Sequence, residues 1–89
     1  MALRKARDAP EKAKVTSVVT KGKHGPYAVA FLESKRLKGS ITFSLAPEIW
    51  SEKRQPSPGE FVALQGIHQK KGGWRSEEAR FWTLSDDKH

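Results

Sequence analysis

Basic side chains and aromatic rings alternate in the last third of the chain. A Lys/Gly loop at residues 68–73 separates two strand-like runs, and the second run, residues 74–82, interleaves arginines with aromatic rings. Lysine and arginine attract phosphate groups, and a flat ring stacks on a flat base. A small β structure that presents both kinds of group side by side therefore suits a polyanion that carries flat bases.

Two predicted turns hold further candidate cations. Lys21 and Lys23 belong to a basic turn in the first third of the chain, and Lys70 and Lys71 belong to the Lys/Gly loop. Lysines in loops are usually only solvated, so each one alone is weak evidence. A barrel that brings both turns to one face, beside the arginines of the last run, would form a cationic cluster.

The aromatic candidates each have a functional and a structural reading. Tyr27 either stacks on a base or packs with Val29 and Phe31. His24 either stacks or donates a hydrogen bond to phosphate, and otherwise it is an exposed loop histidine. Trp74 follows two glycines, which places its ring at the mouth of a loop.

The alternation at the end of the last run leaves two arrangements open. If Phe81 faces the core, Arg80 and Trp82 lie together on the outer face and offer a cation beside a stacking surface. In the other arrangement, Trp82 covers the base of a barrel and Arg80 pairs with Glu78 or Glu60.

Length and charge limit the class of protein. The chain has 89 residues, with 17 Lys and Arg against 10 Asp and Glu and a net charge of +7. One domain is expected at this length, and the charge favours phosphate-bearing partners such as RNA, DNA, a ribosome or an anionic membrane surface. The sequence has no cysteine, no apolar run that could span a membrane and no hydrophobic signal at its N-terminus. We therefore expect a cytoplasmic monomer that does not enter a membrane.

Turn signals divide the body of the chain into five predicted strands. The third strand alternates most clearly, with Ile41, Phe43 and Leu45 directed inward. Pro47 suits the first turn of a short helix after this strand, and Trp50 would plug one end of the structure. The other predicted core residues are Phe31, Phe61 and Val62. The predicted strands cover residues 14–20, 27–32, 39–45, 59–67 and 74–84.

This order of elements predicts an all-β protein. Five short strands, a helical turn between the third and the fourth, and no long helix indicate a small closed barrel without exposed sheet edges. An OB-fold barrel suits the strand count and the helix position best, and an SH3-like barrel is the competing prediction. The expected organisation is a flexible basic tail at residues 1–13, a barrel at 14–84 and a polar tail at 85–89.

Three short motifs carry a resemblance to a known family. Residues 24–29 (HGPYAV) combine glycine with an aromatic residue, residues 39–45 (GSITFSL) join glycine, alternating apolar residues and a late serine, and residues 58–62 (PGEFV) form a turn into a strand. These motifs resemble the oligonucleotide-binding barrels of cold-shock domains and of the repeated RNA-binding domain of the large ribosomal protein of the small subunit. The resemblance covers about four-fifths of the chain.

The resemblance implies a nucleic-acid-binding face on the barrel. The chain departs from the family pattern in the third strand, where Thr42 stands in place of a frequent histidine, and Tyr27 is the one clear ring in the second strand. The tryptophans and arginines of the last strand would compensate for this thinner aromatic platform. The candidate nucleic-acid-binding residues are Lys21, Lys23, His24, Tyr27, Thr42, Lys70, Lys71, Trp74, Arg75, Arg80 and Trp82.

The sequence offers little support for catalysis. Its acidic residues are scattered or adjacent, no nucleophile lies in a recognisable elbow, and no glycine-rich loop leads into a helix. We expect no metal or cofactor, because His24, His68 and His89 lack the spacing of metal ligands.

We therefore predict a protein that is not an enzyme and that binds RNA or single-stranded DNA by electrostatic contact and stacking. The alternative is a small barrel adaptor that docks on a ribosome or polymerase component through Trp50, Trp74 and Trp82.

Overall fold

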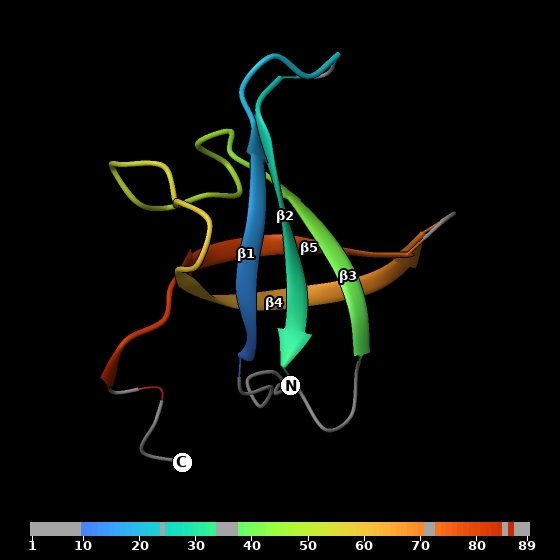
Figure 1. Ribbon diagram of the computed structural model, residues 1–89, viewed down its shortest axis with the longest axis vertical. Coiled ribbons are helices and arrows are strands. Elements are labelled where there is room, and N and C mark those ends of the chain that lie inside the picture. Colours follow the sequence, from blue (N-terminus) through green and yellow to red (C-terminus); the bar gives the residue numbers. More distant parts are fainter. Residues whose placement is uncertain (1–9, 24, 34–37, 71–72, 85, 87–89) are drawn as a thin grey trace, which may run out of the picture.

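Five β-strands make up the body of the protein. The computed structural model describes residues 10–23, 25–33, 38–70, 73–84 and 86. The strands close into a barrel in the order β1-β2-β3-β5-β4, with β1, β2 and β3 upright in Figure 1 and β4 and β5 crossing them. The prediction of an all-β, five-stranded closed barrel is confirmed. The strands are β1 (Glu11–Val19), β2 (Tyr27–Glu33), β3 (Lys38–Ser44), β4 (Phe61–Lys70) and β5 (Gly73–Phe81).

Two pairings close the barrel. The first half of β1 pairs with β4 in antiparallel fashion, from Glu11 opposite Leu64 to Lys14 opposite Phe61. On the other side β3 pairs with β5 in parallel, with Thr42 opposite Arg75. Every strand thus has a neighbour on both sides over at least part of its length, which shortens the strand edges that could recruit another chain. This strand order is consistent with an OB-like barrel.

Small residues on β2 make room for large ones on β3. Ala28 lies opposite Phe43 and Ala30 lies opposite Ile41, and none of these four side chains is exposed to solvent. A narrow barrel interior is filled by alternating small and large side chains in this way. The predicted inward positions of Ile41 and Phe43 are confirmed, and the alanine face of β2 is its inner face.

The predicted core positions of two phenylalanines are wrong. Phe31 alternates with the buried alanines of β2, so it points outward and is 50% exposed. Phe61 is 37% exposed because its neighbour Val62 takes the inward position at the start of β4. Val62 itself is fully buried, as predicted.

Trp50 plugs one end of the barrel, as the sequence predicts. Its side chain is 4% exposed, and its ring stacks on Phe43 at 5.8 Å and meets Phe81 edge-on at 4.9 Å, centroid to centroid. The indole N–H donates a 2.8 Å hydrogen bond to the carbonyl of Arg54. The carbonyl of Ala46 accepts from the amides of two residues of this segment, which is a single turn, and the predicted short helix is not confirmed.

Candidate nucleic-acid interface

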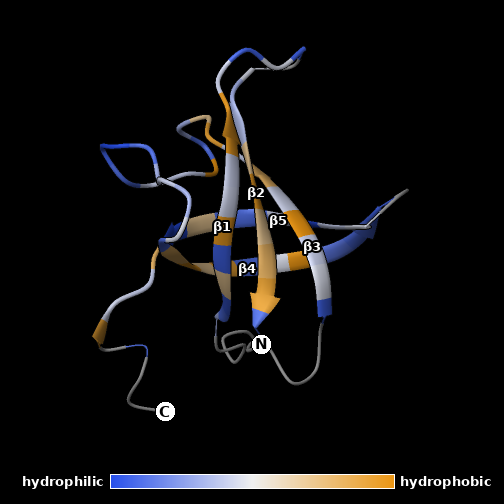
Figure 2. Ribbon diagram, in the orientation of Figure 1, coloured by the Kyte–Doolittle hydropathy of each residue, from blue (hydrophilic) through white to orange (hydrophobic). Residues whose placement is uncertain are grey.

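An open groove of about 650 Å³ lies between the β1–β2 turn, the outer faces of β2 and β3, and the β4–β5 hairpin. Four cationic side chains and one aromatic ring line it, and its described lining contains no acidic side chain. In Figure 2 the β1–β2 turn and the tip of the β4–β5 hairpin are coloured as hydrophilic. The lining residues that carry polar groups or a ring are Lys21, Lys23, Tyr27, Thr42, Ser44, Lys70 and Arg75.

Strand register explains why these side chains meet. Tyr27 at the start of β2 lies opposite Ser44 at the end of β3, and Thr42 is two residues away on the same face of β3. Thr42 also pairs with Arg75 on β5. The side chains therefore form a row across β2, β3 and β5, in which the hydroxyl groups of Ser44 and Thr42 lie between the Tyr27 ring and the Arg75 guanidinium. The floor of the groove is therefore polar and made of short side chains.

The β1–β2 turn holds the ring of Tyr27. A Cβ added at Gly22 would lie 3.0 Å from two ring carbons of Tyr27 and 2.4 Å from the carbonyl oxygen of Gly25. The amide of Gly25 donates a 3.1 Å hydrogen bond to the carbonyl of Gly22, which closes the turn. Only glycine leaves space for this approach of backbone to ring. The turn therefore fixes the ring at the edge of the groove before any ligand arrives.

Six of the predicted site residues line the groove together. They come from the first turn, from three strands of the barrel and from the last hairpin, which the sequence analysis expected a barrel to bring to one face. His24 and Lys71 lie outside the described residues. The six are Lys21, Lys23, Tyr27, Thr42, Lys70 and Arg75.

The remaining predicted residues lie elsewhere. Trp74 is partly buried against the core, and its indole N–H donates a 3.2 Å hydrogen bond to the carbonyl of Lys38. The ring of Trp82 lies 5.3 Å from the ammonium of Lys12, on the β1 side of the barrel. Neither tryptophan belongs to the groove lining, so Tyr27 is the one described ring there.

Arg80 is bound to an acidic partner that the sequence analysis did not consider. Its two terminal nitrogens each donate a 2.8 Å hydrogen bond to the carboxylate of Asp86, which also accepts from the amide and hydroxyl of Thr83. Asp86 falls within the predicted polar tail, yet it is 8% exposed. The hydrogen bonds from Arg80 hold the pKa of the Asp86 carboxyl well below its usual range.

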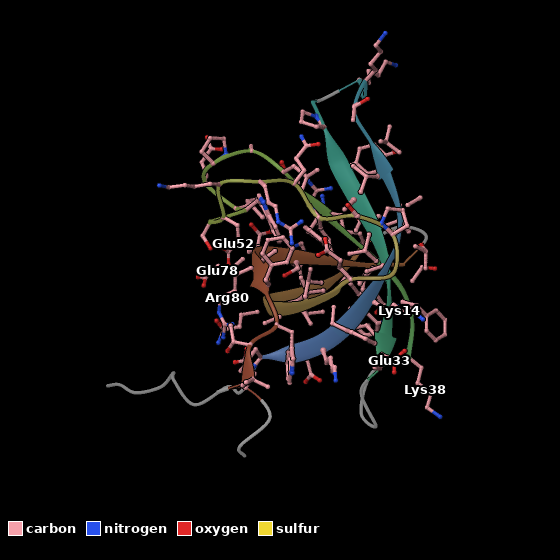
Figure 3. The ribbon with its side chains drawn as sticks, turned by 60° about the vertical axis from the view of Figure 1, so that its left-hand side comes forward. Lys14, Glu33, Lys38, Glu52, Glu78 and Arg80 are labelled. Carbon is pink, nitrogen blue, oxygen red and sulfur yellow. The ribbon has the colours of Figure 1, made fainter. Side chains whose placement is uncertain are left out.

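Figure 3 separates this region from the first strand. Arg80, Glu52 and Glu78 gather on one side of the view, whereas Lys14 lies on the other side of the barrel. The carboxylate of Glu52 accepts a 3.2 Å hydrogen bond from the amide of Phe81, so it helps to fix the end of β5. Arg80 and Glu52 thus contact the end of β5 and the segment after it, and neither lines the groove.

Sequence reasoning missed several residues that the structure places at the surface. Ser44 lines the groove because it shares a face with Thr42, a position that the period of two along β3 indicates. Lys12 was placed in the flexible tail, but β1 begins at Glu11 and alternates Lys12 and Lys14 outward with Ala13 inward. If the alternation of inward and outward residues is extended three residues toward the N-terminus, to Glu11, it places Lys12 and Lys14 on the outer face of β1.

In the described part of the chain, no three His, Cys, Asp or Glu side chains gather to hold a metal ion. Within the same ranges, no helix is long and apolar enough to cross a membrane.

Comparison with known proteins leaves the chain without an assigned relative. No protein-family model, no curated protein and no solved structure matches it.

Proposed function

We propose that the protein binds single-stranded nucleic acid, RNA or DNA, in the groove between the β1–β2 turn and the β4–β5 hairpin. One observation carries the proposal: four cations converge on Tyr27 and two hydroxyl groups, and the described lining contains no carboxylate. Cations neutralise phosphates, and an aromatic ring stacks on any base, so this combination binds a flexible polyanion with little sequence preference.

The position of the groove supports the proposal. OB-fold barrels bind oligonucleotides on the face of their second and third strands, between the loops that join strands 1–2 and 4–5. The groove occupies the corresponding place on this barrel. We also propose that this barrel is related to those of cold-shock domains and of the repeated RNA-binding domain of the large ribosomal protein of the small subunit. The basis of this proposal is the resemblance of the sequence motifs at residues 24–29, 39–45 and 58–62.

The groove composition favours phosphate contacts over stacking. Four cations accompany a single described ring, so electrostatic attraction supplies most of the binding energy in this proposal. For single strands, the slope of log K against log salt is about −0.7 per neutralised phosphate, which gives a slope of about −3 if all four cations take part. Such a slope distinguishes this mode from docking through apolar side chains.

The test is a fluorescence-anisotropy titration of labelled oligo-dT and oligo-U at several salt concentrations. We expect both to bind at low salt, with affinity falling steeply as salt rises. Lys70→Ala should weaken binding to every sequence and flatten the slope by about 0.7. Lys53→Ala is the matched control, because Lys53 is exposed but lies outside the groove lining. Absence of binding at low salt would refute the proposal.

The adaptor alternative has a weaker basis. Trp50 is 4% exposed and serves the core, so its ring is not available as a docking anchor.

We also propose that the protein is a monomer and that it is located in the cytoplasm. The absence of cysteine supports this compartment. That the chain has no catalytic activity remains a prediction from the sequence.

A further inference from the structure

A second surface combines lysines with exposed rings. We call it the aromatic–lysine strip, and its centre is Lys14, which lies directly opposite Phe31 on β2 and directly opposite Phe61 on β4. Residues opposite each other point to the same face of a sheet, so the side chain of Lys14 lies between two phenylalanines on the outside of the barrel. The strip consists of Phe31, Lys14, Phe61, Lys12 and Trp82.

The lysines of the strip lie over its rings. The ammonium of Lys12 is 4.6 Å from the centroid of Phe61 and 5.3 Å from that of Trp82. The ammonium of Lys14 is 5.9 Å from the centroid of Phe61. Attraction between cation and ring holds these side chains against the surface, which orders them in advance of a ligand.

The fold does not require these rings at the surface. The inward positions of the same strands are filled by fully or almost fully buried residues, Ala13, Val15, Leu32 and Val62 among them. Phe31 is 50% exposed and Phe61 is 37% exposed, and they lie on either side of Lys14. Apolar groups that gather on one exposed face mark interaction sites more often than scattered ones do.

The outer face of β2 connects the strip to the groove. Tyr27 in the groove and Phe31 in the strip lie on the same face of β2 with Val29 between them, at a distance of about 13 Å along the strand. Their neighbours on β3 are the short side chains Ser44, Thr42 and Ser40. A polymer that fills the groove can therefore continue along β2 to the strip without meeting a bulky residue.

The acidic residues near this path have cationic neighbours. Glu33 follows Phe31 on the outer face of β2, and it lies directly opposite Lys38 on β3. Glu60 precedes Phe61, and its carboxylate accepts hydrogen bonds of 3.0 and 2.7 Å from Arg54. The path thus presents mainly positive charge to a ligand.

We propose that the aromatic–lysine strip is a second subsite for the same single strand of nucleic acid. The inference rests on the proposed function, and it names the direction in which the strand leaves the groove. Phe31 stacks one base, and Phe61 stacks another as the ammoniums of Lys12 and Lys14 move from its ring to the phosphates between the two bases. Charge, flat rings and continuity with the groove favour this ligand over a protein segment.

The proposal predicts a binding site that is longer than the groove. Single strands occupy roughly 4–16 nucleotides on one OB-type barrel. An oligo-dT of about four nucleotides should fill the groove alone, whereas one of about twelve should also reach the strip. We therefore expect variants of the strip to discriminate between the two lengths and variants of the groove to affect both.

The test compares Phe31→Ala/Phe61→Ala with Tyr27→Ala by anisotropy titration of both oligonucleotides. The double variant should weaken binding of the longer oligonucleotide by about 5- to 150-fold for each base that loses its ring, and leave the shorter one unchanged. Tyr27→Ala should weaken both. Leu84→Ala is the control for removal of an exposed apolar side chain, since Leu84 is 81% exposed and lies outside the strip. It should bind both lengths like the wild type.

Each other result has a distinct meaning. If the double variant binds the longer oligonucleotide like the wild type while Tyr27→Ala does not, the strip is not a subsite and the groove proposal stands. A protein partner would then be the better candidate for the strip. If the double variant weakens both lengths equally, its effect is indirect and the inference fails. If the wild type binds neither, the proposed function fails first. Melting curves of all variants establish that they fold.

Discussion

The two ends of β5 carry arginines in opposite surroundings. Arg75 lines the groove, and no ion pair joins it to an acidic side chain of the described residues. Arg80, at the other end, is bound by both oxygens of a largely buried Asp86. In our proposal the same residue type therefore contacts a ligand at one end of β5, whereas at the other end it stabilises the fold through its ion pair. The two arginines differ because Arg80 has an acidic partner, Asp86, and a count of basic residues does not reveal such a partner.

The surrounding rings repeat this contrast. At the plugged end, defined by Trp50, Phe43 and Phe81, the rings contact one another and fill the interior. At the groove end, defined by Tyr27 and Arg75, the one described ring is held against a glycine turn at the surface. Substitutions at the plugged end should change stability, and substitutions at the groove end should change binding.

The largest expected effect is on stability at the plugged end. Phe43→Ala removes a fully buried ring that stacks on Trp50, so it should lower the free energy of unfolding by about 3–5 kcal/mol in urea melts. Phe31→Ala, a matched truncation of an exposed ring on the neighbouring strand, should cost much less. Equal losses for the two variants would remove the distinction between the inner and outer faces.

The ion pair at the end of β5 should make stability depend on pH. The pKa of Asp86 is lowered in the folded protein, so its contribution is fully present above the ordinary carboxyl pKa of about 4 and is lost progressively as the pH falls from there to the lowered pKa of the folded state. Asp86→Asn should cost about 1–3 kcal/mol at neutral pH and much less in acid, because the pair is already weakened there. Thermal melts at several pH values check this.

A carboxylate outside the ion pair serves as the control. Glu48 is exposed and forms no ion pair with another described residue. Glu48→Gln should therefore change the melting temperature little at any pH. If Asp86→Asn showed the same flat difference from the wild type across the range, the ion pair with Arg80 would not contribute to stability.

At the groove end, we expect loss of binding without loss of the fold. Tyr27→Ala should reduce binding of a single strand by about 1–3 kcal/mol if the ring stacks on a base, and should leave the salt slope unchanged because no charge is removed. Anisotropy titrations at two salt concentrations measure both quantities. A variant that unfolds would show instead that contact of the ring with Gly22 stabilises the turn.

The smallest expected effect compares the two arginines directly. Arg75→Gln should flatten the salt slope by about 0.7, the contribution of one phosphate, and change stability little. Arg80→Gln should leave the slope unchanged and destabilise the protein, because Asp86 loses its partner. A flattened slope for Arg80→Gln would show that its guanidinium reaches the ligand despite the ion pair.

The sequence predicted the barrel because its strands alternate and its turns are marked by glycine and proline. It failed on β2, where both faces carry apolar residues. Alanine is on the inside because Phe43 and Ile41 lie opposite it, and this depends on a register that one strand does not reveal. Phe31 was assigned to the core together with Phe61, and both assignments are wrong.

For the candidate site, the binding role of the residues stays a prediction, and only their placement can be compared with the sequence. Lys21, Lys23 and Lys70 line one groove, as expected from closure of the strands. The partner of Arg80 could not be anticipated, because Asp86 belongs to a segment with little to bury. The aromatic–lysine strip was missed because Phe31 and Phe61 were assigned to the core and because β1 begins three residues earlier than predicted, which adds Lys12 to its outer face.

The pairing of β1 with both β2 and β4 has a consequence for the order in which the protein folds. β1, β2 and β3 are joined by short connections and can pair as soon as they leave the ribosome. The first half of β1, however, gains its second neighbour only when Glu11 pairs with Leu64 of β4, which lies far along the chain. Closing so long a loop is slow, so we expect the first half of β1 to gain its second neighbour only after β1, β2 and β3 have paired.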